Sequence, residues 1–272
     1  MYRAIFVCVL VLCASAASAA PITATSGTAT FVLNTVSGFD GTPTANALGW
    51  GTGDYMFEWG WWSRGPGETL EAPLGAPTSF TETGNVTTLT YSALPGTLSG
   101  VSGTIVHTLV QSGALVTLNT DFTLTNPTLT PISFNMFSFV DFDVNGTAGS
   151  DSVTGVLGDL VVTDATAGAA SYRSANATAF LVRPFSAATD VAGLLNDALV
   201  TNFDNSGLPA TSIDATLGYQ YSVTLGAGQS TTLNLVATNS AAPLASEVPE
   251  PGTVFLMGAG LLALSQLSRL RR

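Results

Sequence analysis

One short segment, Asp-Phe-Asp-Val-Asn-Gly, has residue types at a spacing that could bind a metal ion. Asp141, Asp143 and Asn145 carry side-chain oxygens at positions 1, 3 and 5, and the glycine allows a sharp turn. This pattern is the first half of a calcium loop. Position 12, where an EF-hand has glutamate, is a serine, and the nearest substitute is Asp151 one residue earlier. No flanking helices are predicted, so two interpretations stay open: a calcium site outside an EF-hand, or a strand with two acids on its solvent face that ends in an Asn-Gly turn.

A second candidate is a short aromatic stretch that contains all four tryptophans, from Trp50 to Trp62. Within it, alternate positions would share one face of a strand: Tyr55, Phe57, Trp59 and Trp61. Such rings either stack on sugars at a surface or form one face of an aromatic core, and we favour the core. Trp62 lies on the opposite face with Glu58, which makes it the better candidate for an exposed ring that stacks on a glycan.

Most catalytic signatures are absent from the sequence, and we predict no catalytic residue. The single histidine, His107, lies in an apolar run and is expected to be structural. There is no lysine and no Gly-x-Ser-x-Gly motif, which argues against P-loop, Schiff-base and serine-hydrolase chemistry. A glycosidase that uses a pair of carboxylates stays open, because the spatial pairing of the acids cannot be read from the sequence.

The elements that would position these residues are β-strands. Residues 116–124 and 132–144 alternate apolar and polar side chains with the period of a half-buried strand. Two further alternating runs, 219–225 and 233–237, are separated by Gly-Ala-Gly-Gln and predict a closing hairpin. Helical spacing occurs only at residues 191–200, where Thr189-Asp190 could form the cap.

Weaker strand signals complete the pattern, at residues 30–35, 85–91, 103–111, 155–163 and 179–183. Many short strands with turns rich in glycine and proline favour an all-β fold, an antiparallel β-sandwich with at most one short helix. Residues 20–238 are expected to form this domain, and the small, polar residues 239–247 a linker.

The first nineteen residues are predicted to be a secretory signal peptide. Arg3 precedes an apolar core, and Ala17-Ser-Ala19 is a small-x-small cleavage site. Both cysteines, Cys8 and Cys13, fall inside this segment, so the exported protein would have neither disulfides nor thiols.

Residues 248–272 combine a proline-rich motif, an apolar run and basic residues. Pro249, Glu250 and Pro251 exclude a helix at the start of this region, and residues 253–267 carry no charge. A helix of this length rises roughly 22 Å, which is short of the ~30 Å hydrocarbon core. The following cluster of Arg269, Arg271 and Arg272 would extend the span by snorkelling and hold this end on the cytoplasmic side.

This order of features resembles the PEP-CTERM sorting signal. The motif maps onto Pro249, Glu250 and Pro251, followed by the membrane span and the arginine tail. The resemblance implies an exported protein of a Gram-negative, biofilm-forming bacterium, cleaved by an exosortase, a membrane-embedded protease, after transient insertion in the inner membrane. It covers about 25 of 272 residues and does not say what the rest of the chain does.

The charge of the exported part limits its partners. Residues 20–247 carry three arginines and seventeen acids, a net charge of −14, so nucleic acid is not expected as a partner. We therefore expect a non-enzymatic protein of the cell surface or extracellular matrix, associated with biofilm or exopolysaccharide. The alternative is a carbohydrate-binding module or a carboxylate-dependent glycan hydrolase. No cofactor is predicted apart from the calcium ion considered above.

Overall fold

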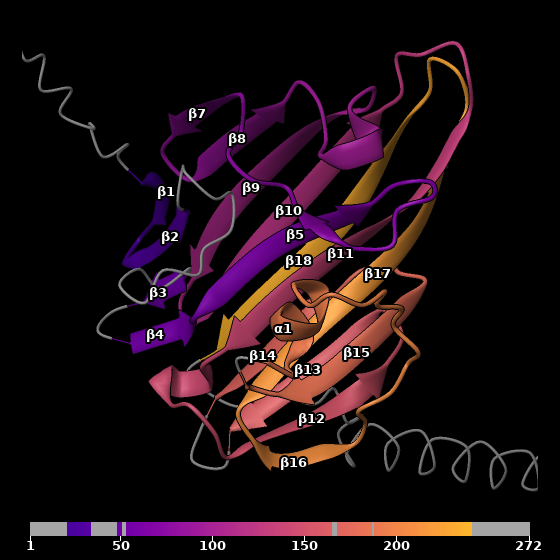
Figure 1. Cartoon of the computed structure of the whole chain (residues 1–272). Coiled ribbons are helices and arrows are strands. Elements are labelled where there is room, and N and C mark those ends of the chain that lie inside the picture. The colour runs from indigo at the N-terminus through magenta and orange to yellow at the C-terminus, as the bar shows by residue number, and fades with distance from the viewer. Residues whose placement is uncertain (1–20, 34–47, 51–52, 165–167, 187, 241–272) are drawn as a thin grey trace, which may run out of the picture.

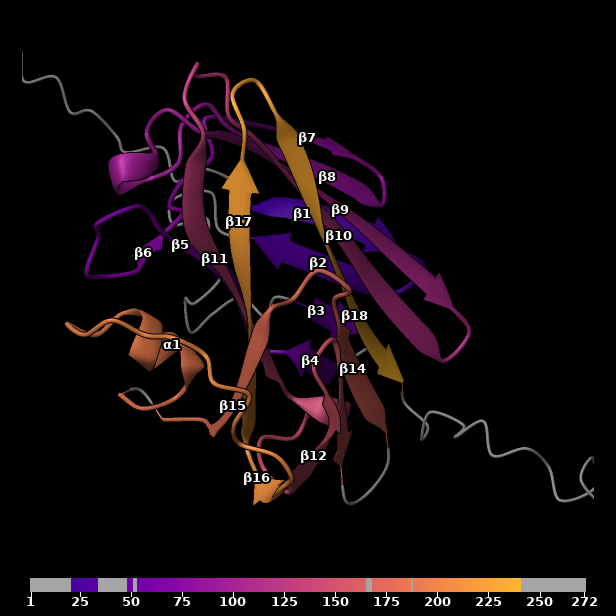
Figure 2. The same ribbon diagram turned by 90° about the vertical axis from the view of Figure 1, so that its right-hand side faces the viewer.

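Two facing β-sheets form the body of the protein (Figures 1 and 2). The computed structural model describes residues 21–33, 48–50, 53–164, 168–186 and 188–240. Within these ranges, eighteen strands form sheets of nine, five and four strands, and all strand pairs within the sheets are antiparallel. The predicted all-β fold is therefore confirmed.

The nine-stranded sheet forms one layer. In spatial order its strands are β16 (Ala210–Ile213), β12 (Asp151–Val156), β13 (Asp159–Asp164), β14 (Ala169–Arg173), β18 (Ser230–Ser240), β10 (Leu115–Thr125), β9 (Ser102–Ser112), β8 (Val86–Tyr91) and β7 (Ser79–Thr83). A 3₁₀ helix, η1 (Gly96–Leu98), lies between β8 and β9 in the sequence.

The five-stranded sheet forms the opposite layer. Its order is β15 (Ala179–Pro184), β17 (Ala215–Leu225), β11 (Ile132–Phe142), β5 (Glu58–Arg64) and β6 (Ala72–Pro73). The four-stranded sheet is built from β1 (Ile22–Ser26), β2 (Ala29–Leu33), β3 (Leu48–Trp50) and β4 (Gly53–Met56).

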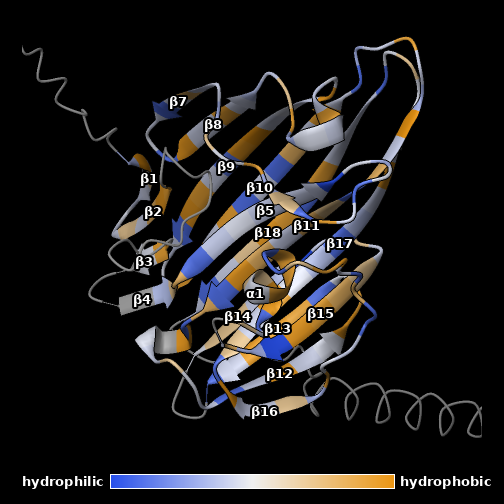
Figure 3. Cartoon of the chain, viewed as in Figure 1, coloured by the Kyte–Doolittle hydropathy of each residue, from blue (hydrophilic) through white to orange (hydrophobic). Residues whose placement is uncertain are grey.

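The large core lies between the two main layers. Alternate residues of β11 face it, among them Phe134, Met136 and Val140, which are at most 5% exposed. Figure 3 shows the corresponding alternation of hydrophobic and hydrophilic positions along the strands. The inward faces of β10, β17 and β18 complete this core, because period-2 side chains of both sheets meet there.

A second, smaller core covers the outer face of the five-stranded sheet. Phe137 and Phe139 of β11 point to this side and pack beneath α1 (Val191–Leu195) and Phe203. Gly218 of β17 allows the close approach, since a Cβ there would lie 2.8 Å from atoms of Val191 and Phe203. The segment that follows β15 therefore forms a third layer over half of this sheet (Figure 2).

The strands predicted from clear alternation are present. Residues 116–124 lie in β10 and residues 132–142 in β11, which gives way to the 3₁₀ turn η2 (Val144–Gly146). The weak run at 155–163 is a hairpin, β12 and β13, rather than a single strand. The helix predicted over 191–200 is confirmed only as the five residues of α1, whose N-cap side chain, Asp190, accepts a hydrogen bond from the Gly193 amide.

The predicted closing hairpin is wrong. β17 pairs with β11 and β15, whereas β18 pairs with β10 and β14 in the opposite sheet. The Gly-Ala-Gly-Gln segment is thus a corner that carries the chain from one layer to the other. Apolar and polar residues alternate in the same way whether a strand pairs with its sequence neighbour or lies in the opposite sheet. The sequence pattern therefore could not distinguish a hairpin from a crossing between the sheets.

The two terminal segments of the sequence lie outside the described residues. This applies to the signal peptide with Ala17 and Ala19, to the Pro-Glu-Pro motif, and to the predicted span with its arginines. Within the ranges that are described, no helix has the length and apolar character needed to cross a membrane.

Candidate functional site

Of the four aromatic residues predicted to share one strand face, all but Phe57 are buried in the protein interior. Trp59 and Trp61 of β5 are at most 2% exposed and make edge contacts with Tyr172 and Phe122, respectively. Phe57 departs from the predicted common face. It lies at the bend between β4 and β5 and packs edge-on against Phe185, with ring centroids 6.5 Å apart.

Trp62 is buried, so the expectation of an exposed stacking ring is wrong. Its side chain faces away from the main core, as predicted, but the segment around α1 covers it and leaves it 0% exposed. The indole Nε1 donates to Asn196 Oδ1 at 3.0 Å, and the ring lies edge-on to Phe139. Trp62 therefore anchors the covering segment to the sheet.

His107 is structural, as expected. Its imidazole is 1% exposed, packs against Phe31 and Trp59, and shares a 2.9 Å hydrogen bond between Nδ1 and Thr120 Oγ1. Burial lowers its pKa to about 3, which keeps the ring neutral.

The residues of the hypothetical calcium loop lie where the chain crosses between the main layers. Asp141 is near the end of β11 in the five-stranded sheet, and Asp151 begins β12 in the nine-stranded sheet. The intervening turn is a 3₁₀ turn in which the Gly146 amide donates to the Asp143 carbonyl at 2.8 Å. No group of three or more His, Cys, Asp or Glu side chains in the described part of the chain is arranged to hold a metal ion. Asp141 is also not on a solvent face, because it is only 2% exposed.

Calcium binding by Asp141, Asp143, Asn145 and Asp151 stays a prediction. A cation bound only by the folded protein would raise the melting temperature, and the rise would grow with the logarithm of the cation concentration above its dissociation constant. We expect any rise at millimolar Ca²⁺, measured by differential scanning calorimetry, to disappear in Asp143→Ala. An unchanged melting temperature in the wild type would favour the simple turn.

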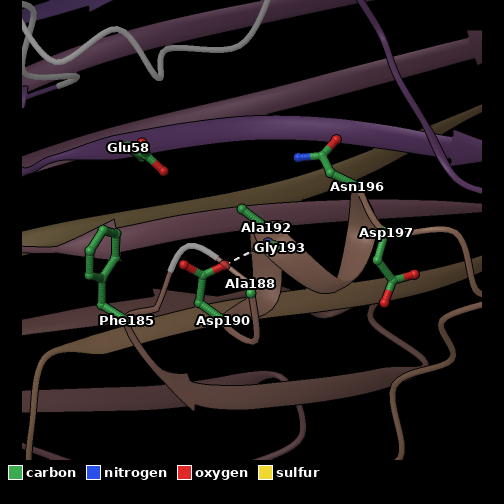
Figure 4. A pocket seen from close by; sticks show the side chains of 8 residues that line it. All are labelled: Glu58, Phe185, Ala188, Asp190, Ala192, Gly193, Asn196 and Asp197. Atoms are coloured by element: carbon green, nitrogen blue, oxygen red, sulfur yellow. Dashed lines mark hydrogen bonds between the residues drawn. The ribbon is translucent and has the colours of Figure 1, made fainter.

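A pocket of about 470 Å³ opens beside Trp62 on the outer side of the five-stranded sheet (Figure 4). Glu58 of β5 lies on one side of it, and Phe185 together with residues from α1 and its flanking turns forms the other. The full lining consists of Glu58, Phe185, Ala188, Asp190, Ala192, Gly193, Asn196 and Asp197. Sequence analysis did not identify this pocket; the one signal for it was a single carboxylate, Glu58, in the aromatic strand.

Carboxylates dominate the electrostatics of the pocket and of the sheet behind it. Burial, and secondarily the charge of Asp190, raises the pKa of Glu58 to about 7. Asp141 is the direct cross-strand neighbour of Glu58, and burial together with nearby carboxylates raises its pKa to about 9. Burial and the neighbouring Asp164 raise the pKa of Asp151 to about 8. Burial disfavours the charged form, and like charges placed opposite each other in a sheet repel, so Asp141 and Asp151 hold protons at neutral pH and Glu58 titrates near it.

The two buried acids of the pocket differ in their availability. Asp190 is 3% exposed, and both of its oxygens accept backbone hydrogen bonds, from Gly193 at 2.5 Å and Ser186 at 3.2 Å. Glu58 is half-buried, and its carboxyl group makes no side-chain hydrogen bond within the described residues. A glycosidase needs two carboxylates free to act on substrate, and Asp190 is committed to capping α1. Asp190 is therefore not free to act with Glu58 as a catalytic pair.

Comparison with known families identifies the sorting signal. A model of the PEP-CTERM protein-sorting motif matches residues 247–272. The chain is a PEP-CTERM domain-containing protein. The motif indicates export and membrane-associated sorting in a Gram-negative bacterium, with processing by an exosortase. The match includes Pro249, Glu250, Pro251 and the arginine tail, and so agrees with the sequence-based assignment.

Comparisons of the remaining domain name no activity for this PEP-CTERM protein. No curated protein matches its sequence. One solved structure, provisionally assigned as an aldose 1-epimerase from Escherichia coli K12, is 9% identical with a TM-score of 0.47, covering 81% of this chain and 98% of that one. Another, provisionally assigned as a kojibiose phosphorylase from human microbiome, is 12% identical with a TM-score of 0.40, covering 89% of this chain and 29% of that one. At these similarities neither activity carries over.

Proposed function

We propose that this chain is an exported, non-enzymatic β-sandwich protein that an exosortase processes and that remains at the cell surface or in the extracellular matrix. The observation that carries the proposal is the sorting motif at residues 247–272. The acidic charge of the exported part supports it, since such a protein stays soluble and does not adhere to anionic lipid. A role in a biofilm or with exopolysaccharide is part of this proposal.

Binding of carbohydrate is the second candidate, and the pocket beside Trp62 favours it. An exposed aromatic ring, Phe185, lies at its edge, and carboxylate and amide groups line its wall. This combination of an apolar face with a few polar groups is typical of small-molecule sites. Hydrolysis is less well supported because Asp190 is committed to its backbone partners.

The role of the arginine tail tests the sorting proposal. Replacing Arg269, Arg271 and Arg272 together with serine should leave export intact, because the N-terminal signal drives it, but should stop the short span from halting in the membrane. We expect unprocessed precursor to accumulate outside the inner membrane.

Fractionation of the native host, with immunoblotting for precursor and product, measures this outcome. A triple Arg→Lys variant is the matched control, since it keeps the positive charge and should be retained and processed normally. Normal processing of the serine variant would contradict the proposal that the arginines position the motif.

A further inference from the structure

The pocket beside Trp62 is lined by acidic side chains and by no basic one. Three carboxylates line it, those of Glu58, Asp190 and Asp197, and no lysine, arginine or histidine does. Both salt bridges among the described residues are elsewhere, joining Arg64 to Glu71 and Arg173 to Asp159. A ligand that enters this pocket is therefore favoured if it brings positive charge.

A buried carboxyl group, that of Asp141, lies beside Glu58 on the neighbouring strand. Asp141 is paired with Glu58 across β5 and β11, is 2% exposed, and has no hydrogen-bond partner at Oδ1. A buried polar atom without a partner costs free energy. A cation held at Glu58 would favour the ionised form of that carboxyl group, so this position suits a positive group.

The pocket has the dimensions and lining of a site for an organic ligand. Its volume of about 470 Å³ is within the range of roughly 300–1,000 Å³ that is usual for small-molecule sites. No three acidic or histidine side chains among the described residues converge as metal ligands would. One edge is apolar instead: Phe185 is 42% exposed and its ring is held edge-on by Phe57.

The polar groups of the pocket are spread along its length. Asn196 uses its Oδ1 to accept from Trp62, which fixes the amide and leaves its Nδ2 as a donor beside the pocket (Figure 4). Asp197 accepts from the Leu199 amide through Oδ1, which leaves its second oxygen as an acceptor. A ligand that carries a cationic group and hydroxyl groups on one small frame is complementary to Glu58, Asn196 and Asp197 together.

We propose that this pocket binds a hexosamine unit with a free amino group, as occurs in a partly deacetylated polysaccharide. The ammonium group lies against Glu58, ring hydroxyl groups bond to Asn196 and Asp197, and the C–H face of the sugar packs on Phe185. The inference gives the carbohydrate-binding candidate a site and a ligand class. It does not depend on how the C-terminal motif is processed.

Isothermal titration calorimetry of the secreted protein tests the proposal, with a glucosamine tetrasaccharide and its fully N-acetylated counterpart as probes at pH 7. We expect saturable binding of the glucosamine oligomer and at least tenfold weaker binding of the acetylated one. Glu58→Gln should weaken binding of the glucosamine oligomer at least tenfold. Asp121→Asn, which removes one carboxylate from the outer side of the opposite sheet, should leave it within twofold.

Four results would overturn the proposal. Three are no binding of the glucosamine oligomer, equal binding of both oligomers, and undiminished binding by a Glu58→Gln variant. The fourth is binding of spermidine as tight as that of the sugar, which would show a site for amines without a requirement for a sugar ring. The melting temperature of each variant is measured first, and Phe185→Ala provides a second pocket variant in which the loss should be at least fivefold.

Discussion

The folded protein should become more stable as the pH falls from 8 to 5, the reverse of ordinary acid denaturation. The pKa values of Asp141, Asp151 and Glu58 are raised to about 9, 8 and 7 by burial and by neighbouring acids. A folded-state pKa above the unfolded value means that the folded protein binds the proton more tightly. The stability is therefore fully present below pH ~4 and is lost as the pH rises through the folded-state values.

The expected effect is large, because the three carboxyl groups act in the same direction and outweigh His107, whose lowered pKa of about 3 opposes them below pH ~6.5. One such group can change the free energy of unfolding by about 1.4 kcal/mol per pH unit, and 1 kcal/mol shifts the melting temperature of a domain of this size by roughly 2–4 °C. We expect the melting temperature to rise by on the order of 5 °C or more between pH 8 and pH 5, measured by calorimetry in EDTA. A melting temperature that falls steadily over this range would contradict the burial of ionisable carboxyl groups.

Asp141→Asn localises this effect. The amide has nearly the same shape and never ionises, so the variant should be more stable than wild type at pH 8 and should depend less on pH. Asp204→Asn removes a charge from an exposed position and should leave the pH profile unchanged. If the melting temperatures of wild type and Asp141→Asn depended equally on pH, Asp141 would not hold its proton through burial.

The sequence located the strands with clear alternation but not their partners. Alternation located β10 and β11 because one face of each packs into the main core and must be apolar. The same alternation in β17 and β18 led to a wrong hairpin, because a period-2 pattern records burial and not which strand lies alongside. Which strand lies beside which is decided by how the two complete sheets pack against each other.

The pocket beside Trp62 could not be predicted from the sequence for a related reason. Trp62 and Asp141 were both assigned to a solvent face, and each does point away from the main core. The outer face is buried by α1 and its flanking loops, more than a hundred residues away from β5 in sequence, as the Trp62–Asn196 bond illustrates. Glu58 and Asp190 lie close together only because this covering segment folds over β5. No pattern within either stretch of sequence therefore indicates that they are neighbours.

Loss of the C-terminal segment is the second large effect that we expect. The Pro249-Glu250-Pro251 motif precedes an uncharged run that is marginal for a bilayer, an arrangement that presents an extended backbone beside the membrane. Replacing all three motif residues with alanine should abolish processing and leave the precursor as the main species in the host, because alanine permits the helix to continue. Replacing Pro243 alone, which lies in the linker and outside the motif, should leave processing normal.

Intact-mass spectrometry of the protein secreted by its own host tests the central claim most directly. The mature protein is predicted to lack both the signal peptide, residues 1–19, and the segment after the Pro-Glu-Pro motif, including Arg269, Arg271 and Arg272. A secreted form whose mass still includes Arg272 would contradict the claim that this protein is sorted and cut through its C-terminal signal.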